Sequence, residues 1–226
     1  MATEVFYALW QWTPALGVGL AQNILISVTA IALGTLLGLL VGALALSPLA
    51  PLRGLARLWV QVFRNAPWLV LIYFTTYVFP FEVQVGGYYL PFPDWLKVTV
   101  GLALPASANV AEIFRGAIGS IPSTQWEAAR SLAFTRGQIF TSIILPQCFK
   151  RMLPPWMNLY AVVTMGTALA SLVGVHDLID TAQIASNTVN LTGFTVLVYL
   201  TVLALFFFYC YPISRLTQRL ERRYAF

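Results

Sequence analysis

The chain has 226 residues, of which 59% are hydrophobic and only 9% are charged, and its mean hydropathy is +0.77. A soluble domain carries about 25% charged residues, so this composition excludes an ordinary water-soluble protein and indicates a lipid bilayer as solvent. A spanning helix needs roughly 20 apolar residues, which allows about five or six spans. We therefore expect an all-α polytopic membrane protein with about five transmembrane helices, in which residues 1–226 form a single transmembrane domain.

The formal net charge is +5, but Lys and Arg in a membrane protein mark cytoplasmic loops. We therefore expect membrane lipid, and not nucleic acid, as a partner. Two cysteines, Cys148 and Cys210, are too few for a disulfide framework. The single histidine, His176, cannot make a metal site by itself and leaves few options for a catalytic triad. We expect no metal site and no catalytic residue.

The first span is predicted over residues 17–46. No charge occurs between Glu4 and Arg53, and Ser47 and Pro48 end the apolar run.

Small residues recur along one face of this first span. Gly34, Gly38 and Gly42 are spaced by four residues, and Ala30 precedes them. Because lipid supplies no hydrophobic driving force between helices, such stripes allow the close backbone approach that packs spanning helices together. The stripe predicts a tight helix–helix contact; the alternative is that glycine is simply frequent in spanning helices.

Apolar runs then alternate with polar connections along the rest of the chain. We expect further spans over 53–78, 95–118, 153–173 and 191–213, a turn-rich connection over 80–93, and a short re-entrant or interfacial piece over 176–190.

Basic residues are distributed unevenly between the two sides of these spans. The start of the second span, the 119–151 segment and the tail after residue 213 carry almost all of them, whereas Lys97 falls opposite, beside acidic residues such as Glu82. Because basic residues concentrate in cytoplasmic loops, we expect the 119–151 segment and the carboxyl terminus inside and the amino terminus outside.

The 119–151 segment is too polar to cross a bilayer. Ser123 or Thr124 can cap a short helix, and Glu127 lies three residues after Thr124, which is the spacing of a capping box. A second helical stretch over 136–144 is expected to stop before Pro146. Two short helices in such a loop predict a docking element for a groove on a partner protein.

One run in this loop resembles a known family. Glu127-Ala128-Ala129, followed by Ile143, Leu145 and Pro146, resembles the EAA loop of permease subunits in bacterial ATP-binding cassette importers. Five further segments resemble motifs of the polar amino-acid uptake branch of that family. They cover residues 64–67, 111–116, 145–147, 151–155 and 220–223. The resemblance covers about residues 19–223 and implies a type I importer permease fold, with 119–151 as the cytoplasmic coupling loop.

The resemblance implies a transport subunit and not an enzyme. It would translocate a polar or charged amino acid, or a close analogue, across the inner membrane by alternating access. The resemblance also implies that part of the loop docks onto a separate ATPase dimer. The implied docking residues are Glu127, Ala128, Ala129, Arg130, Leu132, Ala133, Ile143, Leu145 and Pro146. The sequence contains no Gly-x-x-x-x-Gly-Lys-Ser/Thr phosphate loop, so ATP and Mg²⁺ are expected on the ATPase and no cofactor on this chain. A second permease subunit (a homologue or a second copy) and an extracytoplasmic solute-binding protein are the other implied partners.

The sequence departs from the family pattern at two places. Ala133 replaces the usual glycine at the end of the docking helix, and Met165-Gly166 replaces a Lys-Asp pair that could contact a zwitterionic amino acid. Two explanations stay open for the second departure. Either a different permease subunit holds the solute, which we favour, or the solute is not a typical polar amino acid.

Candidate residues of the translocation pathway are Arg64, Asn109, Glu112, Thr167, Ala168 and Ser171. Charges inside a membrane are costly unless they are paired or functional. The alternatives are an ion pair of Glu112 with Arg115, three residues later, and a snorkelling or lipid-phosphate role for Arg64. An intramembrane enzyme, with Glu112 and Asn109 as its only candidate catalytic pair, and a scaffold without transport activity are the competing functional hypotheses.

Overall fold

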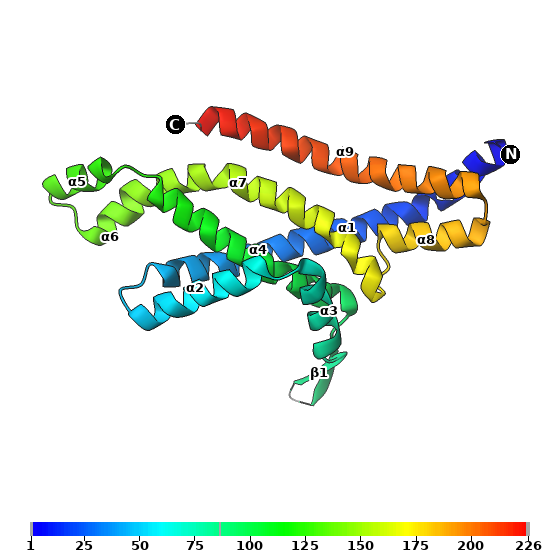
Figure 1. Ribbon diagram of the computed structural model, residues 1–226, viewed down its shortest axis with the longest axis horizontal. Coiled ribbons are helices and arrows are strands. Elements are labelled where there is room, and N and C mark those ends of the chain that lie inside the picture. Colours follow the sequence, from blue (N-terminus) through cyan, green and yellow to red (C-terminus); the bar gives the residue numbers. More distant parts are fainter. Residues whose placement is uncertain (1, 86, 225–226) are drawn as a thin grey trace.

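The computed structural model describes residues 2–85 and 87–224 and is almost entirely helical. The elements in chain order are α1 (Ala2–Ala45), α2 (Ala50–Asn65), α3 (Trp68–Val78), β1 (Glu82–Val85), β2 (Tyr88–Pro91), α4 (Asp94–Gly119), α5 (Ser123–Ser131), α6 (Arg136–Gln138), η1 (Ile139–Ile144), α7 (Leu145–Gly166), η2 (Thr167–Val173), α8 (Leu178–Val189) and α9 (Thr192–Tyr224). They form an elongated bundle with α5 and α6 at one end and the amino terminus and α8 at the other (Figure 1).

Within the described residues, three helices are long and apolar enough to cross a membrane by length and composition. They cover Thr3–Ala45, Arg136–Val173 and Thr192–Tyr224. The other two expected spans correspond to α2 with α3 and to α4, whose 26 residues extend about 39 Å. The all-α expectation is therefore confirmed, apart from one small hairpin.

The glycine stripe of the first span packs directly on α4, as the sequence predicts. A Cβ built on Gly38 lies 2.5 Å from the carbonyl oxygen of Ser107, and one on Gly34 lies 2.8 Å from the Cβ of Ala106. Distances this short leave no room for any side chain. The two backbones therefore approach closely, and α1 lies along α4 over much of its length.

The expected second span is broken into two helices. α2 ends at Asn65, and Ala66 adopts an extended conformation with ψ 137° before Pro67. Proline disfavours the helical conformation of the residue before it and lacks the N–H that would continue the helix. α3 therefore leaves α2 at an angle and leads away from the bundle (Figure 1).

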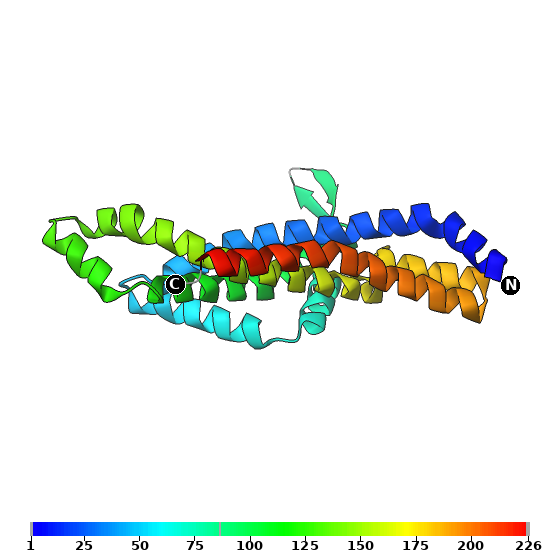
Figure 2. The same ribbon diagram turned by 90° about the horizontal axis from the view of Figure 1, so that it is seen from above.

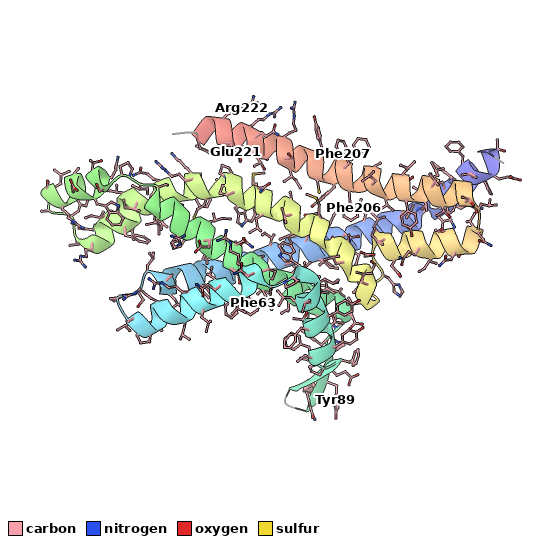
Figure 3. All side chains as sticks on the ribbon, viewed as in Figure 1. Phe63, Tyr89, Phe206, Phe207, Glu221 and Arg222 are labelled. Atoms are coloured by element: carbon pink, nitrogen blue, oxygen red, sulfur yellow. The ribbon has the colours of Figure 1, made fainter. Side chains whose placement is uncertain are left out.

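The connection over 80–93 contains an antiparallel hairpin that the sequence analysis did not predict. β1 pairs with β2 in a register that places Glu82 opposite Pro91, and Gly87 takes a positive φ of 88° in the turn. The hairpin projects from the side of the bundle, with Tyr89 far from the other helices (Figure 3).

The helical stretch that was expected to stop before Pro146 continues through it, so that prediction is wrong. α6, η1, α7 and η2 form one helix from Arg136 to Val173. The turn before Pro146 is a π-helix, in which the amide of Leu145 donates to the carbonyl of Phe140, five residues back. This wider turn absorbs the proline within the helix. The expected span over 153–173 is therefore the second half of a longer helix.

The segment over 176–190 forms α8, which packs between α1 and α9. Leu178, Ala182 and Ala185 are fully buried on its inner face. Figure 2 shows α8 and α9 running side by side at the end of the bundle that holds the amino terminus.

We expect Gly38→Ala to destabilise the protein, because the new methyl group overlaps the backbone of α4. Overpacking typically costs about 1–3 kcal/mol, which lowers the thermal midpoint by roughly 3–10 °C in a chain of this size. The control is Gly17→Ala on the same helix, where an added Cβ meets nothing within 4 Å. Scanning fluorimetry of the purified variants measures both; equal midpoints would contradict the tight α1–α4 contact.

Candidate functional site

The docking loop forms a compact unit at one end of the bundle. α5 follows α4 after only a short turn, and the amide of Ser120 still donates to the carbonyl of Gly116 at the end of α4. Arg151 of α7 donates to the carbonyl and hydroxyl oxygens of Ser120, at 2.9 and 3.0 Å. The loop is therefore fastened to both α4 and α7.

The start of α5 differs from the expected capping box. Pro122 occupies the N-cap position, and no side chain caps the helix. Because the helix begins at Ser123, Thr124 already lies inside the first turn and cannot bridge to Glu127 as an N-cap residue would. A capping box does occur further on, where Thr135 and Gln138 exchange hydrogen bonds at the start of α6.

The residues of the EAA run divide between an inner and an outer face of α5. Ala129 is 2% exposed, whereas Glu127, Ala128 and Arg130 are exposed. Leu132, one residue beyond the helix, is 73% exposed. The outer face therefore exposes an acid, a base and a large apolar side chain.

A small hydrophobic cluster holds the inner face of α5 against the end of the bundle. Its buried members are Ala117, Ile121, Ala129, Ile139, Ile144 and Cys148, and Ile143 packs against them. Ile143 therefore packs with the cluster that contacts the inner face of α5, whereas Leu145 and Pro146 are exposed. The small side chain of Ala129 is what lets α5 lie close to this cluster.

The docking helix ends in a Schellman motif built on alanine. The amide of Phe134 donates to the carbonyl of Ala129 and the amide of Ala133 to that of Arg130, and Ala133 has a φ of 59°. This position usually holds glycine, because the left-handed conformation costs other residues about 1–2 kcal/mol. Ala133 therefore keeps the helix end at some cost in stability.

We expect Ala133→Gly to stabilise the end of α5, because glycine adopts a positive φ without steric cost. The gain is at most about 1 kcal/mol, since glycine also raises the entropy of the unfolded chain. Amide hydrogen exchange should show slower exchange in α5. Ala128→Gly, a matched change within the same helix, should instead speed exchange by removing helix propensity; faster exchange in both variants would contradict the assignment.

A second group of predicted residues meets at a polar pocket between α2 and α4. Glu112 accepts two hydrogen bonds from Arg115, at 2.9 and 2.7 Å, and lies 3.5 Å from Arg64. The structure thus contains the ion pair of Glu112 with Arg115 and adds Arg64 from another helix. Asn109 donates to the carbonyl of Pro105 within its own helix. Glu112 and Asn109 each have partners other than one another, which gives no support to a catalytic pair.

The remaining pathway candidates lie along η2 with different exposure. Thr167 is completely buried and donates to the carbonyl of Thr164. Ala168 and Ser171 are half-exposed, and Ser171 donates to the carbonyl of Ala168. The hydroxyl of Thr167 therefore faces the interior of the bundle, whereas the other two candidates can reach its surface.

Met165 and Gly166, which stand where the family has Lys-Asp, have apolar surroundings. Met165 is 55% exposed and lines a groove of about 570 Å³ between α7 and α9. Phe206 and Phe207 of α9 line the same groove (Figure 3). A Cβ on Gly166 would lie 3.1 Å from the Trp68 indole. An acidic side chain at position 166 would therefore have to displace that ring.

A buried polar network, which the sequence pattern does not indicate, joins α1, η2 and α8. The side-chain amide of Asn23 donates to Thr167 and to Asp177, at 3.0 and 3.1 Å, and its oxygen accepts from the amide of Leu178. Burial raises the pKa of the Asp177 carboxyl, against the hydrogen bonds that it accepts. A polar amide inside the charge-free run before Arg53 was the signal that could have revealed Asn23.

Lys97, predicted to lie on the side opposite the docking loop, is also fully buried. Its ammonium lies 3.0 Å from the Asp94 carboxylate and 3.8 Å from the centre of the Phe81 ring. This ion pair and cation–π contact tie the base of the hairpin to the first turn of α4. Burial of the lysine depends on the hairpin, which is why spacing along the sequence did not indicate it.

A bundle of long apolar helices, with a short polar helix held at one end, defines a helical membrane protein. The comparisons agree: the family described as "Binding-protein-dependent transport system inner membrane component" matches residues 34–225. The chain belongs to this family and is a transport subunit of the inner membrane rather than an enzyme. Members of the family work with a binding protein and with an ATPase on a separate subunit.

Individual relatives extend over nearly the whole chain. The probable amino-acid ABC transporter permease YckA of Bacillus subtilis is 31% identical over 92% of this chain and 88% of its own length. The probable glutamine ABC transporter permease GlnM of the same organism is 32% identical over 91% of this chain and 93% of its own. A crystal structure of an amino acid ABC transporter with histidines has a TM-score of 0.84 at 27% identity, and covers 96% of this chain and 98% of its own.

Proposed function

We propose that the chain translocates an amino acid, polar or charged, or a close analogue, across the inner membrane by alternating access. The names of YckA and GlnM, and the solved amino acid transporter, support this substrate class. The observation that carries the proposal is the exposed α5 with its buried Ala129, a docking helix joined without a flexible linker to two long helices.

The proposed orientation places the docking loop and the carboxyl terminus in the cytoplasm and the amino terminus outside. Arg222, near the end of α9, and the start of α2 lie in the same half of the bundle as α5 (Figures 1 and 3). Basic residues gathered at one end favour the cytoplasm for that end. The hairpin and α8 then face the extracytoplasmic solute-binding protein.

Coupling follows from the way in which the loop is built. The proposed ATPase dimer, which holds ATP and Mg²⁺, receives Glu127, Ala128, Arg130 and Leu132 in a cleft on its surface. Because the cluster beneath α5 joins it to α4 and α7, movement of the ATPase displaces both helices as rigid bodies. Half-exposed Ala168 and Ser171 are proposed to line the pathway that this motion opens and closes.

We expect Glu127→Lys to abolish coupling, because it reverses the charge at the exposed centre of the docking helix without touching the core. Proteoliposomes that contain the permease, its ATPase and its binding protein report solute uptake and solute-stimulated ATP hydrolysis. Both should fall to background while membrane insertion is unchanged. The control Glu221→Lys reverses another exposed acid, on α9, and should transport. Normal uptake by Glu127→Lys would exclude the docking assignment.

The second permease subunit is proposed to be a homologue that holds the solute. The uncharged side chain of Met165 and the Trp68 indole against Gly166 support this, since neither position carries the charge that a Lys-Asp pair would offer to a zwitterion. We expect the purified transporter to contain one copy of this chain and one of a related permease, measured by native mass spectrometry. A complex with two copies of this chain, active in transport, would contradict the proposal and favour an unusual solute.

A further inference from the structure

The polar pocket between α2 and α4 has an excess of positive charge. Its volume is about 610 Å³, and it also includes Ala45 at the end of α1. The polar side chains that line it are Arg57, Gln61, Arg64, Asn65, Glu112 and Arg115. Three guanidinium groups thus share one carboxylate, and this imbalance favours an anionic ligand.

The three arginines in the pocket differ in how many of their hydrogen-bond donors are used by Glu112. Glu112 binds Arg115 through both oxygens and approaches Arg64, and this contact orients two guanidinium groups at the pocket wall. Arg57 is exposed and makes no ion pair with any residue in the described ranges 2–85 and 87–224. Its donors, and those of Arg64 and Arg115 that Glu112 does not use, remain available to a ligand.

α2 also presents an exposed apolar face, further round the helix from this polar face. Arg57, Gln61 and Arg64 follow one another at helical spacing and form the polar face. Leu55, Leu58 and Val62 form the apolar face and are 62%, 57% and 50% exposed. The centres of the two faces are about 125° apart around the helix axis, so a ligand held at the arginines needs long apolar chains to reach this strip.

The pocket also lies near one end of the bundle. Glu112 is seven residues before the end of α4, so it lies about 10 Å along the helix axis from the docking loop. In the proposed orientation this is the cytoplasmic leaflet, where anionic headgroups concentrate and where basic pockets between spanning helices bind them.

We propose that this pocket binds the phosphate group of an anionic phospholipid, whose acyl chains lie along Leu55, Leu58 and Val62 of α2. Inorganic phosphate and a solute carboxylate share the anion chemistry, but neither would use the apolar face. The assignment of the site to the cytoplasmic leaflet rests on the proposed orientation. The assignment of the head-group site rests only on the pocket, so lipid binding can be tested without a transport assay.

The test compares lipid retention by the purified transporter in nanodiscs of phosphatidylcholine with a minor fraction of phosphatidylglycerol. Native mass spectrometry should detect phosphatidylglycerol that stays bound after dilution, and Arg57→Gln should weaken its binding roughly fivefold to tenfold by removing one charge-assisted contact. The control Arg219→Gln removes an equally exposed arginine from α9 and should bind like the wild type. Equal retention by both variants would overturn the proposal.

Two further measurements separate the possible sources of the anion. A photoactivatable phosphatidylglycerol analogue should crosslink to residues 50–65 of the wild-type chain. This experiment does not depend on the folding of a variant. Crosslinking confined to other helices would overturn the proposed site. Displacement of the lipid by millimolar inorganic phosphate would show a phosphate site instead. If Arg57→Gln raises the half-saturating solute concentration and leaves lipid retention unchanged, the pocket belongs to the solute, and the lipid proposal fails while the transport function stands.

Discussion

The close contact between α1 and α4 is the constraint on which the rest of the bundle depends. Gly34 and Gly38 bring the two backbones together where any side chain would collide. α1 then serves as a support for later elements: Gly19 lies against the start of α8, and Thr35 accepts a hydrogen bond from Trp156 of α7. In lipid, such backbone proximity and interhelical hydrogen bonds replace the hydrophobic effect as the source of stability between helices.

The proposed docking loop is a small surface that is packed against large helices. α5 carries an exposed face for a partner, but its buried Ala129 and the cluster around Ile139 and Ile144 join it to the ends of α4 and α7. Because packed cores transmit displacement and do not deform continuously, the proposed movement of α5 would displace both helices. The alanine at the left-handed position 133 shows that this helix end is retained even at an energetic cost.

The polar groups of the bundle fall into two kinds. Asn23 and Asp177 are buried and join α1 to the start of α8, and buried Lys97 pairs with Asp94 of its own helix and contacts the Phe81 ring before the hairpin, so these groups hold neighbouring elements together. The arginines around Glu112 line an open pocket and outnumber their acidic partner. Enclosure therefore separates groups that stabilise the fold from groups that can meet a ligand.

The sequence by itself determined the membrane environment, the α1 packing face, the position of the helical EAA loop and the family, because composition, glycine spacing and a local motif carry that information directly. Only the tertiary structure decided which side of the docking helix is buried, that the helix continues through Pro146, and that Asn23, Thr167 and Asp177 meet. These features depend on contacts between residues far apart in the chain and on a π-turn that absorbs a proline, which local pattern does not encode.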